Sequence, residues 1–234
     1  MNKTKGRKKM KKFLTVFLVA LALFSFIGCD NSTPNPEDQL PAIPDKIEIP
    51  SATESLPQEL VGLSNFFYND SIVYSSFTAV SNSYDKDGNL VLKTTTKMEG
   101  TRSTVIYEIG SKINIEGLSV IKANSTIRAE GSTDAPAPEK VEMDGKKVSF
   151  IDVMLDFEKL YSIVDKETSA DKGVGELKIG EKTYDIVEEG VYNGEVSKYT
   201  TTITPAYEGI TSFIVYDGYV VEIVGGEYNG VYNL

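Results

Sequence analysis

Few residues in this chain are of the types that commonly carry out catalysis. The 234-residue sequence contains no histidine and one cysteine, Cys29. Catalytic triads that need histidine, cysteine–histidine pairs and imidazole metal sites are therefore excluded. The chemistry that remains is a thiol at Cys29, the carboxylates and lysines, and the hydroxyl groups of tyrosine, serine and threonine.

Cys29 directly follows a segment with the pattern of an export signal. Seven basic residues precede Phe13, and an apolar run of fifteen residues extends from Phe13 to Ile27. As a helix this run would be about 22 Å long, which is shorter than the roughly 30 Å hydrocarbon core of a bilayer. We therefore expect residues 1–28 to be a secretory signal peptide rather than a stable transmembrane span.

The residues around this cysteine resemble the lipobox of bacterial lipoproteins. In Phe26-Ile27-Gly28-Cys29, Gly28 and Cys29 match the family pattern, whereas Phe26 and Ile27 depart from it. The resemblance implies cleavage between Gly28 and Cys29 and attachment of lipid to the Cys29 thiol, with acyl chains such as palmitate holding the protein on a membrane. The alternative is an incidental cysteine in an ordinary secretory signal or an uncleaved anchor.

This resemblance places the expected working site outside the cytoplasm, on the bacterial cell envelope. The outer membrane or the cell surface is the favoured location. The inner membrane stays an alternative, because Asp30 follows Cys29 and resembles a retention signal of some bacteria.

The residues after Cys29 predict a spacer and then one folded domain. Residues 29–50 are rich in proline and small polar residues, which favours an extended tether. Residues 51–234 are of a length that suits a single globular domain. Of the 24 basic residues, seven leave with the signal, so 17 remain against 34 acidic residues, a net charge of −17. Such an acidic surface disfavours nucleic acid as a partner.

The domain should begin with a helix. Ser55 and Gln58 fit a capping box, with Pro57 in the first turn. Apolar residues then recur at helical spacing on one face: Leu56, Leu60, Leu63 and Phe67.

Strand patterns separated by turn signals follow this helix. Asp87-Gly88 and Asp144-Gly145 are typical hairpin turns. The expected strands are 72–84, 90–98, 103–109, 112–116 and 118–129, followed by a loop over 131–139 and a hairpin over 143–148.

A second helix, over residues 150–164, has the clearest pattern in the chain. Ser149 can cap it, and an apolar stripe from Phe150 to Val164 should pack on the sheet. A polar connection over 165–173 is expected next. The last strands are expected over 177–179, 182–188, 196–204, 211–216, 219–224 and 228–234.

Together these elements predict a β-rich α+β fold. We expect an antiparallel meander sheet of about ten strands, flat or curled into a half-barrel, with one helix at the start and one amphipathic helix packed on the sheet. The order of elements is loosely similar to that of the lipoprotein-carrier half-barrels LolA and LolB, although no residue motif supports this similarity.

No motif in the domain predicts catalysis, a metal site or a cofactor. The acidic run at Asp85–Asn89 lacks the glycine and glutamate positions of a calcium loop and is interpreted as a hairpin turn. Gly173-Val-Gly175 is interpreted as a loop. Glu188 and Glu189 are neighbours on a predicted strand, so their side chains should face opposite sides and cannot form an acid–base pair.

Tyrosine is the one residue type that suggests a binding surface. Eight of the thirteen tyrosines lie between Tyr184 and Tyr232. Half-buried strands explain such a concentration, and so does a recognition surface. The candidates for an exposed surface are Tyr216, Tyr219, Tyr228 and Tyr232.

Three classes of function remain open after this reading. The first is a non-catalytic binding or interaction module for a protein, peptide or glycan, and acidity and tyrosine content favour it. The second is a carrier of lipid or another apolar ligand, which would need a cavity between sheet and helix. The third is a hydrolase that uses carboxylates or a serine–lysine pair, which would need a convergent polar cleft.

Overall fold

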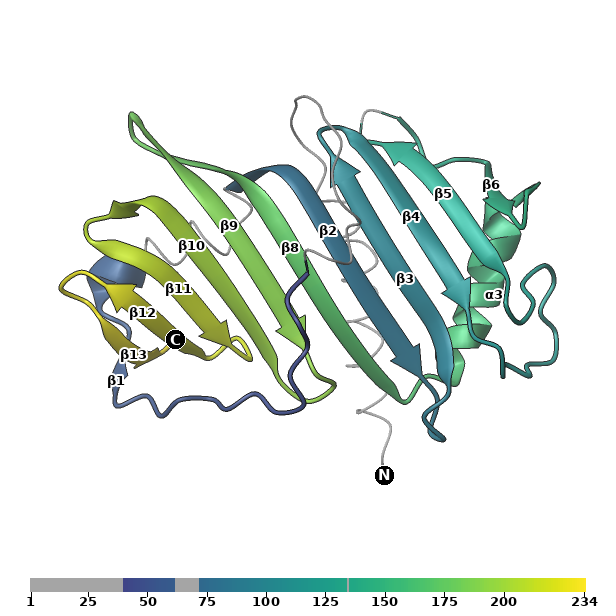
Figure 1. The fold of residues 1–234 in the computed structure, drawn as a ribbon, viewed down its shortest axis with the longest axis horizontal. Helices are drawn as coiled ribbons and strands as arrows, with labels where there is room; N and C mark the ends of the chain where they lie inside the picture. The colour runs from purple at the N-terminus through teal and green to yellow at the C-terminus, as the bar shows by residue number, and fades with distance from the viewer. Residues whose placement is uncertain (1–39, 62–71, 134) are drawn as a thin grey trace.

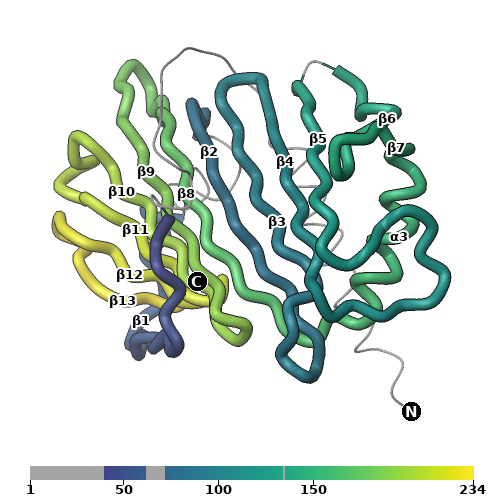
Figure 2. The backbone as a smooth tube through the Cα atoms, turned by 45° about the vertical axis from the view of Figure 1, so that its right-hand side comes forward, coloured from purple at the N-terminus to yellow at the C-terminus, as the bar shows by residue number. Residues whose placement is uncertain are grey.

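The domain is built on one wide, open β-sheet. The structure, a computed structural model, describes residues 40–61, 72–133 and 135–234. Its thirteen strands follow the order β1-β13-β12-β11-β10-β9-β8-β2-β3-β4-β5-β6-β7 (Figure 1). The first and last strands of this order stand at opposite ends, and the sheet twists along its width without closing (Figure 2).

Two runs of antiparallel strands make up most of the sheet. The first meander consists of β2 (Ile72–Tyr84), β3 (Leu90–Glu99), β4 (Arg102–Ile109), β5 (Thr126–Ser132), β6 (Lys140–Met143) and β7 (Lys146–Ser149). The second consists of β8 (Lys166–Ile179), β9 (Lys182–Tyr192), β10 (Ser197–Tyr207), β11 (Ile210–Tyr216), β12 (Val220–Gly225) and β13 (Gly230–Asn233). The short strand β1 (Glu54–Ser55) lies parallel to β13, so the sheet is mixed.

The two meanders meet in the middle of the sheet. The chain leaves β7 at one edge, runs back through the helix α3 (Phe150–Ser162) and enters β8 beside β2. Strands β2 and β8 pair antiparallel from Ile72 opposite Leu177 to Tyr84 opposite Lys166. Each meander therefore starts at the centre and proceeds outward (Figure 1).

The expected β-rich class and most hairpins are confirmed, but the strand count and the single meander are not. Thirteen strands in two meanders replace the expected ten in one. Residues 112–116 and 118–125 form loops rather than strands. Residues 165–173, expected as a polar connection, belong almost entirely to β8, where β2 and β9 on either side pair with their backbone.

Helix α3 begins where the sequence predicts. The hydroxyl of Ser149 accepts a hydrogen bond from the backbone N–H of Asp152 at 3.4 Å, which caps the first turn. Val153, Phe157 and Leu160 are at most 1% exposed. They pack on side chains of the first meander, which include Val91, Leu92, Tyr107, Ile109, Ile127 and Val141. Burial of each such side chain stabilises the fold by roughly 1.5–3 kcal/mol.

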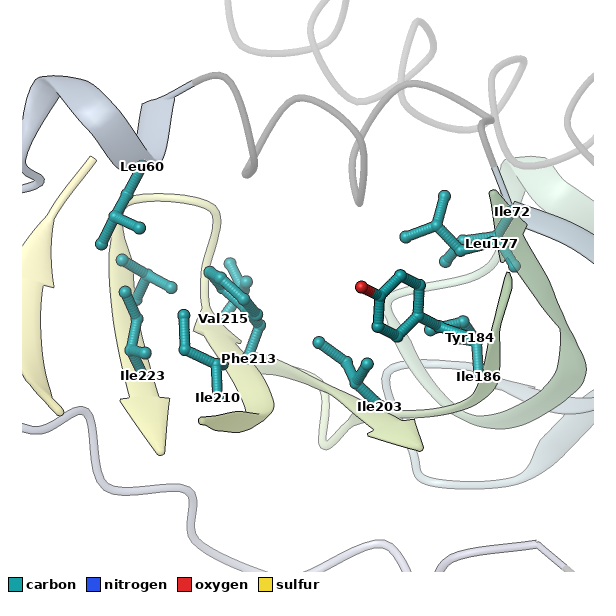
Figure 3. Close-up of a cluster of buried hydrophobic side chains, with 11 residues drawn as sticks. Leu60, Ile72, Leu177, Tyr184, Ile186, Ile203, Ile210, Phe213, Val215 and Ile223 are labelled. Atoms are coloured by element: carbon teal, nitrogen blue, oxygen red, sulfur yellow. The ribbon is translucent and has the colours of Figure 1, made fainter. Parts of the chain in front are cut away.

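A second apolar cluster occupies the other half of the same face. Leu60 extends from a helical segment over residues 58–61 toward strands of the second meander (Figure 3). The cluster contains Ile72, Leu177, Tyr184, Ile186, Ile203, Ile210, Phe213, Val215, Val221 and Ile223. Ser55 pairs with Asn233 in β1 instead of capping this helix, and Leu63 and Phe67 lie outside the described residues.

Each helical segment packs on a meander other than the one that directly follows it in the sequence. The segment at 58–61 precedes the first meander but packs on the second, and α3 precedes the second meander but packs on the first. Ser83 of β2 is opposite Leu92 on one side and Glu167 on the other, so these three side chains share a face of the sheet. Leu177 is on the same face, because it lies an even number of residues from Glu167 along β8. Both clusters therefore lie on one face, which we call the inner face.

On the outer face, the described end of the expected tether lies against the sheet. Ile47 is 9% exposed and packs with Tyr216 and Val220. The side-chain amide of Asn193 donates a hydrogen bond to the carbonyl oxygen of Asp45 at 3.2 Å. The segment from residue 45 to β1 is thus attached to the domain over the second meander (Figure 1).

A buried carboxylate connects α3 to the loop before β5. The Asp156 side chain is fully buried and accepts hydrogen bonds from the backbone N–H groups of Ser119, Val120 and Ile121 at 2.7–3.0 Å. Lys159 contacts the same carboxylate at 3.1 Å and donates to the Gly117 carbonyl. These contacts explain why residues 119–121 are not part of a strand, because their N–H groups donate to Asp156 of the helix instead of to a neighbouring strand.

These contacts also set the titration of Asp156. Burial by itself would raise the pKa of this carboxyl group. The backbone N–H groups of Ile121, Val120 and Ser119, together with Lys159, outweigh burial and lower the pKa to about 2.

We predict that Asp156→Ala lowers the free energy of unfolding by about 3 kcal/mol, because three backbone N–H groups lose their acceptor. Since the folded pKa lies below the ordinary value, the stabilisation by Asp156 is complete above about pH 4 and is lost as the pH falls toward 2. Urea unfolding at pH 7 and pH 3 measures both effects. The control is Glu158→Ala, on the exposed side of α3. Equal losses in the two variants would contradict this role.

Candidate functional site

Between the two apolar clusters, the inner face carries polar side chains at the centre of the sheet. Tyr74 on β2, Asp171 on β8, Glu188 on β9, and Tyr199 and Thr201 on β10 form this group, which we call the central polar band. The registers place them on one face, since Glu188 is opposite both Gly173 and Thr201, and Asp171 and Tyr199 are both opposite Gly190. Four adjacent strands therefore bring together residues from 74 to 201.

Glu188 is held by two hydroxyl groups. The Tyr74 hydroxyl donates to Oε1 at 2.9 Å, and the Thr201 hydroxyl lies 3.4 Å from Oε2. Burial raises the pKa of the Glu188 carboxyl, and these two hydrogen bonds oppose the rise. The hydroxyls thus fix the direction of this carboxylate in the band.

Asp171 has a more unusual environment than Glu188. Burial, and then the charge of Glu188, raise the pKa of the Asp171 carboxyl to about 7, against a smaller lowering by the backbone of Gly190. None of these groups is cationic. Near neutral pH this carboxyl group can therefore either donate a proton or accept hydrogen bonds.

Two glycines lack the side chains that would otherwise overlap with residues of the band. A Cβ atom added to Gly190 would lie 2.5 Å from Oδ1 of Asp171 and 2.6 Å from Cε1 of Tyr199. A Cβ atom on Gly173 would overlap the ring of Tyr74. Aromatic side chains commonly cover glycines in this way across neighbouring strands. Burial, with the charges of Asp171 and Glu188, raises the pKa of Tyr199 to about 12.

On the outer face of the same strands, a basic and an acidic side chain form an ion pair. Lys172 contacts Glu189 at 2.8 Å, so the neighbours of Asp171 and Glu188 form an ion pair on the far side of the sheet. This arrangement confirms that Glu188 and Glu189 face opposite sides. A carboxylate pair does exist on the inner face, but it joins Asp171 with Glu188.

Sequence reasoning missed this band for an identifiable reason. Asp171 and Gly173 lie in a stretch without apolar alternation, and such a pattern predicts a polar connection and a loop. The signal that could have found them is the length of β8, whose fourteen residues pair on both sides. Position 74 gave no signal, because a tyrosine is ordinary in a strand.

The four tyrosines expected on a binding surface do not share one face. Tyr216 is buried on the outer face and donates to Glu222 at 2.9 Å. Tyr219 is 49% exposed in the turn before β12. Tyr228 and Tyr232 pack against the inner apolar cluster, and the Tyr232 hydroxyl donates to the Tyr228 carbonyl.

Of the remaining residues singled out from the sequence, some lie outside the described residues and others can be located. Gly28 and Cys29 lie outside the described residues. The Asp85 carboxylate accepts hydrogen bonds from the backbone N–H groups of Asp87 and Asn89, which matches the expected turn. Among the described residues, no group of three or more acidic or cysteine side chains could hold a metal ion. In the same part of the chain, no helix has the length and apolar character to cross a membrane.

Comparison with known proteins identifies no relative of this chain. No protein-family description, no curated protein and no solved structure matches it. The features of this chain that bear on function are therefore the central polar band and the sequence around Cys29.

We predict that stability falls as the pH rises through the titration of Asp171. The folded pKa of about 7 lies above the value of about 3.9 for an unfolded chain, so the folded state binds the extra proton between these values. Asp171→Asn should raise the free energy of unfolding at pH 8 by about 2–4 kcal/mol and should leave it little changed at pH 4.

Denaturant unfolding between pH 4 and pH 9 measures this difference. The matched control is Asp185→Asn, at an exposed position of β9, which should follow the wild type at every pH. A wild-type curve that rises between pH 5 and pH 8 relative to that of Asp171→Asn would refute the buried state of Asp171.

Proposed function

We propose that this protein is a lipid-anchored, extracytoplasmic binding protein of the bacterial cell envelope, and that the central polar band is its ligand-binding surface. The observation that carries this proposal is the concentration of partly buried Tyr74, Asp171, Glu188 and Tyr199 between two apolar clusters. Burying carboxyl groups costs free energy unless something compensates for it. A ligand that forms hydrogen bonds there would supply that compensation.

The lipid anchor is part of the proposal because it determines the cellular compartment in which the protein would bind its ligand. Residues 1–28 have the pattern of a signal peptide, and Gly28-Cys29 resemble the end of a lipobox. Attachment of residues 45–52 to the outer face supports a tether that reaches the domain from the side opposite the band. The proposed location is the outer membrane or the cell surface, with the inner membrane as the alternative.

The carrier alternative receives less support from the inner face. The open sheet is consistent with a half-barrel, as expected for a carrier. Its apolar side chains, however, already have protein partners, since α3 packs on one cluster and Leu60 packs on the other. Between the clusters, the carboxyl and hydroxyl groups of the central polar band lie beside Phe77, whose ring contacts that of Tyr74. Such a mixed surface favours a ligand with hydrogen-bonding groups over a lipid tail alone.

A carboxylate-dependent hydrolase is a second candidate, because one specific observation favours it. Burial, and then the charge of Glu188, raise the pKa of Asp171, and acid–base cleavage of glycosides uses two carboxyl groups of which one keeps its proton near neutral pH. In that reading Asp171 would be the general acid, and Glu188 would be the base or the nucleophile.

We expect a palmitate analogue fed to the expressing bacterium to label the wild-type protein and not Cys29→Ser, because the thiol is the proposed attachment point. Labelled protein is detected after gel electrophoresis, and immunoblotting shows that both variants are made. The control Ser32→Ala, three residues further along, should be labelled like the wild type. Labelling of Cys29→Ser at the wild-type level would contradict the anchor.

We expect at least one class of small polar ligand to raise the melting temperature of the wild type, and Tyr199→Ala to reduce that rise by at least half. The panel consists of neutral sugars, organic cations, short peptides and phospholipid vesicles, measured by thermal shift. The control is Tyr219→Ala, an exposed tyrosine outside the band. Mass spectrometry of each mixture detects cleavage, which would favour the hydrolase. If no class shifts the wild type, the binding proposal is wrong.

A further inference from the structure

The two carboxyl groups of the central polar band differ in how well they are partnered. Each oxygen of Glu188 has a neutral hydroxyl group near it, from Tyr74 or from Thr201. Asp171 is half-buried like Glu188, and within the described part of the chain no side chain donates a hydrogen bond to it. Among the described residues, the contact that favours its charged form is a hydrogen bond with the backbone of Gly190. Two half-buried carboxyl groups side by side, one of them without a side-chain donor, favour a donor from outside the chain.

Basic side chains of the same strands are directed away from this site. Lys172, next to Asp171 in sequence, is paired with Glu189 on the outer face. Lys198, next to Tyr199, lies with its ammonium group 5.7 Å from the centre of the Tyr216 ring, also on the outer face. At the level of the central polar band, the inner side of β8, β9 and β10 thus carries carboxyl and hydroxyl groups, whereas the apolar residues of the second cluster lie further along the same strands.

Aromatic surface lies beside the carboxyl groups. Tyr199 is opposite Gly190, is 40% exposed and lies close to Asp171, whose charge raises its pKa. Tyr74 covers Gly173 and donates to Glu188. Faces of tyrosine rings attract organic cations, and carboxylates accept the N–H groups of such cations. A metal ion fits less well, because calcium takes six or more oxygen ligands.

We infer that the central polar band binds an organic cation, a primary ammonium or guanidinium group, with Asp171 and Glu188 accepting its N–H groups and Tyr199 lying against its apolar part. This inference rests on the proposed binding function and names its ligand class. The net charge of −17 expected after signal removal would raise the local concentration of such ligands.

The site should also bind its ligand more tightly as the pH rises. Within the described residues, the titratable groups that face Asp171 are Glu188 from β9 and Tyr199 from β10, and on β2 the residue opposite it is Ala79. None of these groups carries a positive charge. Because the pKa of Asp171 is raised to about 7, this carboxyl group carries its full negative charge only above neutral pH. A bound cation stabilises the charged form, so binding releases a proton near pH 7.

The test is isothermal titration calorimetry on the full-length protein in neutral detergent, at pH 6 and pH 8. Agmatine, spermidine and the peptide Gly-Arg-Gly are the probes, which distinguish a free guanidinium compound, a polyamine and a peptide side chain. We expect at least one probe to bind at pH 8 and to bind at least threefold more weakly at pH 6. Asp171→Asn and Glu188→Gln should each weaken that binding at least tenfold.

Two controls separate this inference from the proposed function. Asp185→Asn removes the same charge from an exposed position on β9 and should change the affinity less than twofold. An equal loss in Asp185→Asn and Asp171→Asn would mean non-specific attraction and would overturn the inference. Absence of binding by all three cations would overturn it as well. If a neutral sugar binds instead, in a manner that depends on Tyr199, the proposed binding function stands and the cation is wrong.

Discussion

The antiparallel pairing of β2 with β8 holds the two halves of the sheet together. It joins two meanders that each run outward from the centre, and it exists because α3 carries the chain back from the sheet edge. The pairing also aligns Tyr74 with the glycines of β8, and the adjacent pairing of β8 with β9 brings Asp171 beside Glu188. Without it, neither the thirteen-strand sheet nor the central polar band would form.

The inner face combines apolar clusters, whose burial stabilises the fold, with carboxyl groups, whose burial destabilises it. The apolar clusters are covered by α3 and by the helical segment at 58–61, and each helical segment packs on the meander that does not follow it. Because of this packing, both halves of the sheet are stabilised by apolar contacts. These contacts offset the free-energy cost of the partly buried carboxyl group of Asp171 at the centre. Asp156 shows the opposite case, in which a buried carboxylate has three backbone donors and a lowered pKa. The contrast with Asp171 is what marks the band as a candidate site.

Much of the fold could be predicted from local sequence, and the site could not. Helix α3, its cap at Ser149 and the turns at Gly88 and Gly145 depend on residues near one another in the chain. The pairing of β2 with β8 joins residues about ninety positions apart, and the centre of β8 lacks the apolar alternation that identifies a strand. The anchor at Cys29 was inferred from local sequence alone, and it stays a prediction.

Titration of the side-chain carboxyl groups by carbon NMR shows whether Asp171 is shielded from solvent beside Glu188 on the inner face of the sheet. Comparison of the wild type with Asp171→Asn assigns the resonance, and its midpoint should lie about three pH units above the ordinary aspartate value of about 3.9, near the pKa of about 7 that burial and Glu188 produce. A midpoint between pH 3 and pH 4.5 would mean that Asp171 is solvated, and it would contradict both the band and the functions proposed for it.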